Sequence, residues 1–277
     1  MKIIRNTKEL MKFLDSINDL SSSIGLVLTM GNIHAGHLSL VREAKSNNKF
    51  VITSIFVNPT QFNNNDDYIS YPKTLNKDIA KLRSFNCDLL YLPSVDEMYP
   101  KGLVTEKSIL KYRDILCDVA RPGHFDGVTT VVNTFFNIIK PKNSYFGEKD
   151  YQQMKLIDEM VKIKKLNINI IPCSSIRDKN GMSLSSRNSN FTPNQYKIFE
   201  SFAKKINQFV EKLKQKNLEA NFDEFKKELL KININKIDYL EIRNENNLEI
   251  TKNYSNARLF VAVFIGSIRI IDNFKLY

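Results

Sequence analysis

The sequence has few cysteines and no long apolar run. Its three cysteines, Cys87, Cys117 and Cys173, lie far apart and form no C-x-x-C pair, which argues against a disulfide framework and a thiolate zinc site. The most apolar segment, Leu259 to Ile265, is far shorter than the roughly 18 residues that a membrane span needs. The first residues show no apolar run followed by a small-residue cleavage site. We therefore expect a cytoplasmic protein that has no membrane partner.

The length of the chain limits the number of domains, and its charge bears on the kind of partner it could bind. A chain of 277 residues with 42% hydrophobic residues has room for one large or two modest domains with a core. The 41 Lys and Arg residues exceed the 30 Asp and Glu residues, and a net charge of +11 would suit an anionic partner such as nucleic acid. Much of this charge lies on helices around Lys204 to Lys231, without interleaved aromatic platforms on which bases could stack. A solvated basic face is the better interpretation, and we expect no nucleic-acid partner.

Strand-like and helix-like segments alternate through the first two-thirds of the chain. Buried strands are predicted at Ile24–Leu28, Phe50–Val57, Leu89–Leu92, near Ser144 and at Ile168–Ile171. Helices are predicted after an Asn6 cap (Leu10, Phe13, Leu14 and Ile17 inward), from Gly36, and at Thr74–Phe85, Gly127–Ile139 and Asp150–Lys164. This alternation predicts an α/β fold with a Rossmann-like parallel sheet and helices on both faces. Ligands of such sheets bind at the carboxyl ends of the strands.

The pattern changes after about Ile176. Two Lys-rich helices are predicted at Pro193–Lys214 and Asn221–Leu230. Consecutive strands follow at Ile237–Ile242, Arg258–Ile265 and Ser267–Ile271. Short turns between strands favour an antiparallel sheet, so residues 177–277 are predicted to form a smaller α+β domain beside a larger domain at residues 1–176.

Two of the three histidines occupy a place where phosphate binds readily. His34 and His37 belong to the segment Thr29-Met-Gly-Asn-Ile-His-Ala-Gly-His37, after the first predicted strand and at the start of a helix. Unpaired N–H groups and the helix dipole favour an anion at such a helix start. Gly31 and Gly36 have P-loop spacing, but His37 occupies the lysine position, and the chain has no G-x-G-x-x-G. Two N–H-donating imidazoles suit charge stabilisation in a phosphoryl-type transition state.

Two alternatives stay open at this point. His34, His37 and His124 could bind a metal ion, although no neighbouring Asp, Glu or Cys completes a familiar ligand spacing, and we predict no protein-bound metal. The histidine pair could also be purely structural.

The His34-Ala-Gly-His37 segment is similar to the H-x-G-H signature of the nucleotidyltransferase superfamily. Further motifs follow in order at Phe56–Phe62, Tyr71–Thr74, Arg121–Val128, Phe146–Gln153 and Gly181–Asn188. Together they resemble the pantothenate synthetase family, the pantoate–β-alanine ligases. This resemblance implies ATP-dependent condensation of (R)-pantoate with β-alanine through a pantoyl adenylate, with release of AMP and pyrophosphate. It also implies a homodimer and Mg²⁺ carried by ATP.

The resemblance assigns roles residue by residue. The implied catalytic residues are His34, His37, Lys149 and Arg187. The implied ATP-binding residues are Met30, Gly31, His34, Gly36, His37, Gly147, Lys149, Asp150, Ile176, Leu184, Ser185, Ser186 and Arg187. The implied substrate-binding residues are Thr29, Met30, Asn58, Gln61, His124 and Gln153. The domain at residues 1–176 would bind nucleotide and pantoate, and residues 177–277 would close over the active site.

Several positions depart from the family pattern, and some roles stay open. Leu28 replaces a proline and could reshape the pantoate pocket, Lys73 and Asp126 replace arginines, and Asn63 replaces a glycine. Asp126 is expected to make the site entrance less basic. His124 is either a substrate contact or a structural loop residue, and Asp66 and Asp67 either help to hold magnesium or are merely solvated. A rival enzyme would transfer AMP to a phosphate, but the uncharged Gln61 and Gln153 favour a hydroxy acid.

Overall fold

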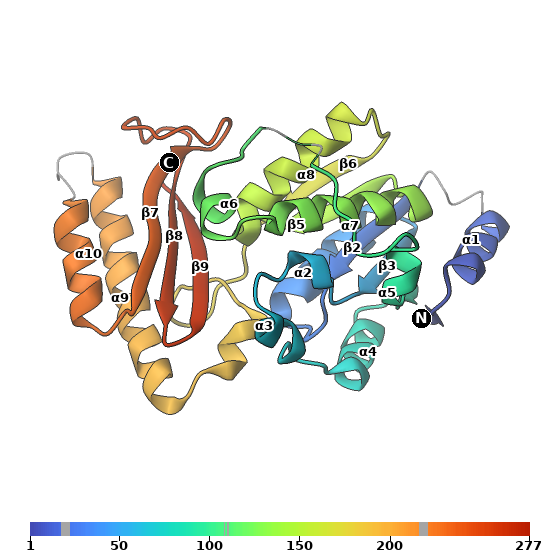
Figure 1. Cartoon of the computed structure of the whole chain (residues 1–277), viewed down its shortest axis with the longest axis horizontal. Helices are drawn as coiled ribbons and strands as arrows, with labels where there is room; N and C mark the ends of the chain where they lie inside the picture. The colour runs from blue at the N-terminus through green and yellow to red at the C-terminus, as the bar shows by residue number, and fades with distance from the viewer. Residues whose placement is uncertain (18–22, 108, 110, 216–220) are drawn as a thin grey trace. The chain divides into compact units, whose positions relative to one another are not determined.

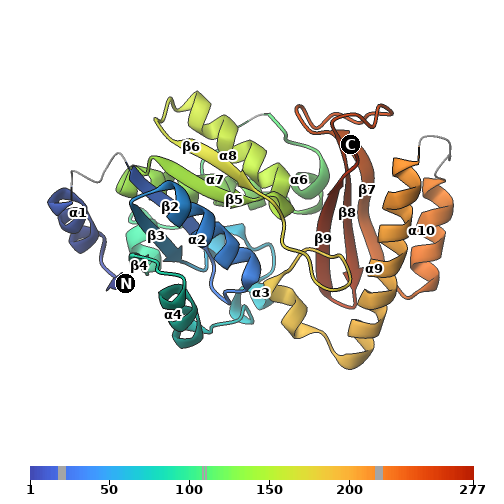
Figure 2. The same cartoon turned by 180° about the vertical axis from the view of Figure 1, so that it is seen from behind.

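The computed structural model describes residues 1–17, 23–107, 109, 111–215 and 221–277. The chain divides into two compact units, Met1–Ser174 and Ser175–Tyr277, which Figures 1 and 2 show from opposite sides. Within these described ranges, no helix combines the length and the hydropathy that crossing a bilayer requires.

The first unit is built on a six-stranded parallel sheet with the order β1-β4-β3-β2-β5-β6. Its strands are β1 (Lys2–Ile4), β2 (Ile24–Thr29), β3 (Phe50–Ile55), β4 (Leu89–Tyr91), β5 (Asn143–Gly147) and β6 (Asn169–Cys173). From β2 the chain adds β3 and β4 on one side, and then β5 and β6 on the other. The strand order therefore reverses between β2 and β5, which is where such sheets bind ligands.

Helices cover both faces of this sheet, as the sequence predicts. They are α1 (Thr7–Ser16), α2 (Ala35–Asn47), α3 (Asn65–Ile69), α4 (Leu75–Ser84), α5 (Val95–Met98), α6 (Leu116–Ala120), α7 (His124–Ile139) and α8 (Tyr151–Ile163), with short 3-10 turns η2 (Pro59–Gln61) and η3 (Glu148–Asp150). On one face Val41 of α2 and Leu82 of α4 join a core with Val27 and Val51. On the other face Phe135 of α7 makes an edge contact with Tyr91 at 6.1 Å between ring centroids.

Some element boundaries differ from the predicted ones. β1 was not predicted, because a three-residue strand is too short to show a period and forms only by pairing with the distant β4. α7 begins at His124 rather than Gly127, since Gly123 adopts a left-handed conformation (φ 80°) that lets the helix start earlier. The predicted strand to Val57 ends at Ile55, and the chain then forms η2 at Pro59.

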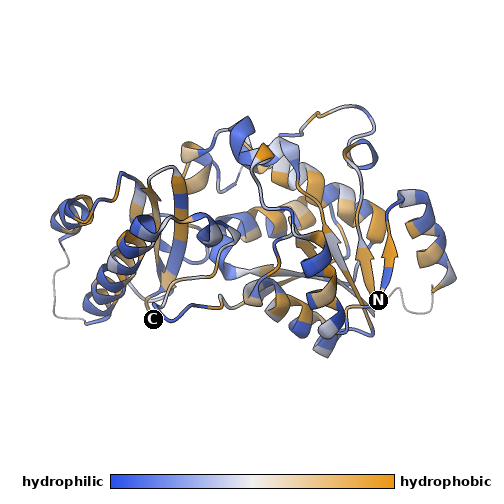
Figure 3. Ribbon diagram, turned by 90° about the horizontal axis from the view of Figure 1, so that it is seen from below, coloured by the Kyte–Doolittle hydropathy of each residue, from blue (hydrophilic) through white to orange (hydrophobic). Residues whose placement is uncertain are grey.

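The second unit is α+β, as predicted. Its antiparallel sheet has the order β7 (Lys236–Asn244), β8 (Ala257–Ile265), β9 (Ile268–Lys275). The other elements are η4 (Ser186–Asn190), α9 (Pro193–Lys214) and α10 (Phe222–Lys231). Phe202 of α9, Leu229 of α10 and Leu259 of β8 belong to one buried core. In Figure 3 the strands carry much of the orange of hydrophobic residues, and the helices are largely blue on their outer sides.

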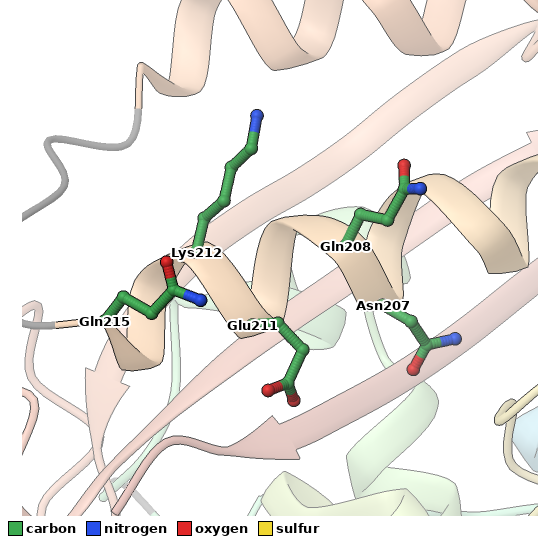
Figure 4. A pocket seen from close by; sticks show the side chains of 5 residues that line it. All are labelled: Asn207, Gln208, Glu211, Lys212 and Gln215. Carbon is green, nitrogen blue, oxygen red and sulfur yellow. The ribbon is translucent and has the colours of Figure 1, made fainter.

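A hollow lies on the surface of the second unit. It is lined by α9 and the residue after it, through Asn207, Gln208, Glu211, Lys212 and Gln215 (Figure 4). None of these side chains is among the predicted site residues.

Candidate active site

The loop that carries the two histidines follows β2 and begins with two residues in left-handed conformations. Gly31 has φ +85°, and a Cβ atom there would lie 3.2 Å from Ile55 and 3.3 Å from the Asp78 carboxylate. The next residue, Asn32, also has a positive φ of 49°. Only glycine fits the first position without strain, so the loop requires Gly31 and an external anchor.

Asp78 on α4 supplies this anchor. Its side chain is 1% exposed and accepts hydrogen bonds from the backbone N–H groups of Asn32 (3.0 Å) and Ile33 (2.8 Å). One helical turn later, Lys81 Nζ donates to the Ile33 carbonyl oxygen at 2.5 Å. Neither Asp78 nor Lys81 is among the residues predicted from the sequence motifs. Their only local sign is the i, i+3 spacing on the helix that follows the Tyr71–Thr74 motif.

The two imidazoles form the first turn of α2. His34 is the N-cap, and its Nδ1 accepts from Gly36 N at 3.1 Å, a close approach that Gly36 permits because it lacks a Cβ. His37 Nδ1 accepts from His34 N at 3.4 Å. The ring centroids are 4.1 Å apart. Because both Nδ1 atoms accept, a neutral ring carries its proton on Nε2, and both Nε2–H groups are able to donate to a ligand.

Both histidines are neutral at pH 7. Burial, followed by the positive charges of Lys149 and Lys81, lowers the pKa of His34 from 6.5 to about 4. Burial, with smaller effects of His34 and Lys149, lowers the pKa of His37 to about 3. The pair therefore acts through N–H dipoles in the unliganded protein, and an arriving phosphate would favour the protonated forms.

Lys149 lies at the neighbouring strand end. It belongs to η3, directly after β5, and β5 pairs with β2 through Val27 and Tyr145. Its ammonium is 3.6 Å from the Asp150 carboxylate. The charge of Lys149 lowers the pKa of both histidines, so this cation lies within electrostatic range of the two imidazoles. The structure thus brings together the predicted residues on both sides of the strand-order reversal.

The uncharged residues form a second group at the ends of β2 and β3. Asn58 is 1% exposed, and its Nδ2 donates to Gln61 Oε1 at 3.1 Å. Gln61 Nε2 in turn contacts Met30 Sδ at 2.8 Å. Thr29 Oγ1 donates to the Ser54 carbonyl and accepts from Gly31 N, so it links this group to the histidine loop. Asn58 Oδ1 also accepts from Tyr99, so the Asn58 amide is held by the protein on both sides and supports Gln61.

His124 and Arg121 hold the backbone of Gln61. His124 Nδ1 and Arg121 Nη2 both bond the Gln61 carbonyl oxygen, at 2.8 Å and 2.9 Å. Arg121 Nη1 lies 3.0 Å from His124 Nε2. The carbonyl accepts from Nδ1–H, so Nε2 is the acceptor for Arg121. Both ring nitrogens of His124 thus have protein partners, which favours the structural alternative over a substrate contact and over a metal ligand.

The remaining predicted residues of the first unit lie near the same strand ends. Gly147 is the last residue of β5, and the half-buried Gln153 lies in the first turn of α8. Asp126 is 3% exposed, and its carboxylate pairs with Arg113 at 2.7 Å. Its charge is compensated by Arg113, and the expectation that it makes the site entrance less basic stays a prediction.

The other departures are less consequential. Leu28 is half-buried in β2, whereas Lys73 is exposed. Asn63 Nδ2 donates to the Pro122 carbonyl at 2.7 Å, a contact that a glycine would lack.

The predicted nucleotide residues of the second unit form one segment. Leu184 N donates to the Ile176 carbonyl at 3.0 Å, and the Ile176 side chain is 38% exposed. Ser185 caps η4 by accepting from Arg187 N at 3.3 Å. Ser186 and Arg187 are half-buried in η4.

The described ranges contain no group of three or more His, Cys, Asp or Glu side chains that could hold a metal ion. Asp66 and Asp67 lie in the first turn of α3, where Asn64 caps the helix. The second of these carboxylates is half-buried and the first is exposed.

Comparison with known proteins finds relatives over nearly the whole chain. The profile described as "Pantoate-beta-alanine ligase" matches residues 2–275. The chain belongs to the pantoate–β-alanine ligase family. A pantothenate synthetase of Thermosipho africanus is 40% identical over 276 residues, covering 99% of each chain. The resemblance that the sequence motifs indicate is therefore confirmed, and the protein is a ligase.

Solved structures of this ligase family have the same fold. Pantothenate synthetase from Thermus thermophilus superposes with a TM-score of 0.89 at 33% identity, with both chains covered completely. A pantoate–β-alanine ligase from Francisella tularensis, solved in complex with β-γ ATP and β-alanine, gives a TM-score of 0.87 at 39% identity and covers 100% and 98% of the two chains.

Proposed function

We propose that this protein condenses (R)-pantoate with β-alanine in two steps that consume ATP. The proposal rests on the two imidazoles at the start of α2, whose Nδ1 atoms each accept a backbone N–H. Lys149 lies beside them, and the uncharged group around Gln61 lies next to them. A cationic and N–H-rich phosphate site adjoining an amide-lined pocket suits a nucleotide and a hydroxy acid. The family membership and the Francisella tularensis complex with β-γ ATP and β-alanine support the same substrates.

In the first step, a pantoate carboxylate oxygen attacks the α-phosphorus of ATP. The new O–P bond replaces the bond to the β-phosphate bridging oxygen, and pyrophosphate leaves. His34, His37 and Lys149 stabilise the charge on the α-phosphate and on the leaving group, and His37 donates from Nε2. The site supplies orientation and charge stabilisation, and no protein nucleophile is required.

In the second step, the β-alanine amine attacks the acyl carbon of pantoyl adenylate. The C–N bond forms, the C–O bond to AMP breaks, and the amine loses a proton. Thr29, Met30, Gln61 and Gln153 hold pantoate throughout, with Met30 against its geminal methyl groups. Asn58 and His124 support Gln61 from behind, which is why we assign them positioning roles.

The nucleotide is proposed to contact the residues that the resemblance assigns to it. Gly147 and Asp150 contact the ribose, Gly31 and Gly36 allow the phosphates to approach the backbone, and Ile176 backs the adenine. Leu184, Ser185, Ser186 and Arg187 close over the phosphate chain as part of the second unit. This closure would shield the adenylate from water between the two steps.

Mg²⁺ is proposed to enter with ATP. The described residues offer no cluster of three ligand side chains, which fits an ion held chiefly by phosphate oxygens. When bound, the ion would neutralise phosphate charge.

We further propose a cytoplasmic homodimer with free thiols at Cys87, Cys117 and Cys173, and no nucleic-acid partner.

The test is release of AMP and pyrophosphate from ATP and Mg²⁺ with D-pantoate, with and without β-alanine. Sustained AMP release that requires both substrates supports the proposal. Pyrophosphate release that requires a phosphorylated acceptor instead would overturn the role of Gln61 and Gln153 and favour the rival nucleotidyltransferase.

A further inference from the structure

A buried carboxylate in the second unit holds the hairpin that precedes the nucleotide segment. Asp272 lies on β9, and its side chain is 0% exposed. Its Oδ2 accepts from Arg177 Nη1 at 3.0 Å and from Ser183 N at 2.8 Å. Its Oδ1 accepts from Ser183 Oγ at 2.7 Å. One side chain therefore joins both ends of the Arg177–Ser183 hairpin, which are themselves paired as an antiparallel bridge.

Arg177 reinforces this anchor from the hairpin side. Its Nη2 donates to the Asn273 carbonyl at 2.7 Å, and its guanidinium lies 4.5 Å from the centroid of the Phe274 ring. Its Nη1 also bonds the Gly181 carbonyl at 2.8 Å, inside the hairpin. The tip is fixed from α9, where Asn207 donates to the Asn180 carbonyl at 2.9 Å. The hairpin thus has fixed ends and a fixed tip.

The predicted ATP-contacting residues begin directly after this anchor. Leu184 follows Ser183 and bonds back to Ile176, and Ser185 then caps η4, which contains Arg187. None of these hydrogen bonds involves Asp272, and Ser183 links Asp272 to Arg187 along the chain. Because only a few residues separate Ser183 from Arg187, a displacement of the hairpin base would move Arg187 as well.

We propose that Asp272 is a positioning residue for adenylation: it fixes the base of the Arg177–Ser183 hairpin so that Ser185, Ser186 and Arg187 engage the phosphate chain. This inference rests on the proposed function, since it assigns Asp272 to the first of the two steps. It predicts that loss of the Asp272 carboxylate weakens adenylation and leaves aminolysis of preformed pantoyl adenylate unchanged.

The chain offers a matched control. Asp238 on β7 is also buried, at 4% side-chain exposure, and its carboxylate pairs with Arg269 at 2.7 Å and with Lys236 at 2.8 Å in the same sheet. These partners lie outside the hairpin. Asp272→Asn and Asp238→Asn therefore each weaken a buried ion pair, but only the first variant disturbs the Arg177–Ser183 hairpin.

The experiment measures pantoate-dependent ATP–pyrophosphate exchange and, separately, AMP release from synthetic pantoyl adenylate with β-alanine. For Asp272→Asn we expect exchange to fall at least tenfold, aminolysis to stay within twofold of wild type, and backbone amide exchange to increase across residues 177–187. Asp238→Asn should keep both activities within twofold. Equal exchange rates in the two variants, or equal losses in both partial reactions of Asp272→Asn, would overturn the inference.

Ser183→Ala keeps the Asp272–Arg177 ion pair and removes the hydrogen bond from Ser183 Oγ to Asp272. It replaces Asp272→Asn as the test variant if Asp272→Asn does not fold. We expect its exchange rate to fall about threefold with aminolysis unchanged, and an unchanged exchange rate would contradict the inference. If wild-type protein shows no pantoate-dependent exchange, the proposed function itself fails, which is a different outcome from failure of the variants.

Discussion

His34 and His37 are locked through the same ring atom: each Nδ1 accepts a backbone N–H, from Gly36 and from His34 respectively. This arrangement is a capping box in which imidazoles replace the usual hydroxyl and carboxylate. The backbone bonds fix the tautomer, so both Nε2–H groups are able to donate to phosphate.

Replacing His37 with asparagine separates the two functions of this ring. An Asn side-chain oxygen can take over the Nδ1 acceptor position, but nothing replaces the Nε2 donor. We expect kcat to fall about 100- to 1000-fold with little change in ATP affinity, as for loss of one donor to a developing oxyanion. His37→Ala should lower kcat similarly and also reduce the melting temperature. Steady-state kinetics and thermal unfolding check both variants, and an unchanged kcat in either one would refute the role.

The lowered histidine pKa values predict a pH-dependent stability. With folded values of about 4 and 3 against 6.5 for the ordinary group, the unfolded chain binds more protons between these limits. Stability is therefore fully present above pH 6.5 and decreases as the pH falls toward the folded values. Each histidine contributes a slope of about 1.4 kcal/mol per pH unit in this window.

Urea unfolding at pH 5 and pH 7 measures this slope. A double variant, His34→Asn with His37→Asn, serves as the control and should show a flatter dependence. The same slope in both proteins would show that other groups cause the pH dependence. Because the chain has three histidines, proton NMR can also follow each ring directly.

Asp78 holds the histidine loop in its conformation by accepting two of its backbone N–H groups. In Asp78→Asn, the amide oxygen can accept from only one of the two N–H groups, and the NH₂ group would face the other. We expect a loss of about 1–3 kcal/mol in the free energy of unfolding, together with a fall in kcat. Lys77→Ala, at an exposed position of the same helix, is the control. Wild-type kcat in Asp78→Asn would mean that the loop keeps its shape without this anchor.

Restoring the family's arginine at position 126 should be harmful in this protein. Arg113 is the cation of a buried ion pair with Asp126, and the side-chain exposures are 16% for Arg113 and 4% for Asp126. Asp126→Arg would bury two cations together, and we expect a destabilisation of about 3–5 kcal/mol. The charge-swapped variant, Arg113→Glu with Asp126→Arg, should regain part of this loss. Chemical denaturation checks both, and a stable single variant would contradict the compensation.

Local sequence signals were sufficient for the parts of the fold that depend on periodicity. The Asn6 cap was predicted and is present, with Glu9 N donating to Asn6 Oδ1 at 3.1 Å. The parallel sheet followed from alternating strands and helices, and the position of His34 and His37 at a helix start followed from the adjoining strand and glycines. These features depend on residues within a few positions of one another.

The anchors of the site could not be predicted in this way. The bond from Asn32 to Asp78 spans 46 positions, and the bond from Ser183 to Asp272 spans 89. A buried aspartate on an otherwise amphipathic helix or strand gives no local sign of its partner. The environment of Asp126 could not be predicted from the sequence either. Its carboxylate is compensated by Arg113, which lies 13 positions away.

Transfer of labelled oxygen tests the proposed adenylate most directly. With D-pantoate carrying ¹⁸O in its carboxylate, the proposed attack on the α-phosphorus transfers one labelled oxygen to AMP when β-alanine displaces it. Mass spectrometry of the products should find one ¹⁸O in each AMP and none in pyrophosphate. Unlabelled AMP, or label in a released phosphate, would contradict the adenylate and with it the roles given to His34, His37 and Lys149.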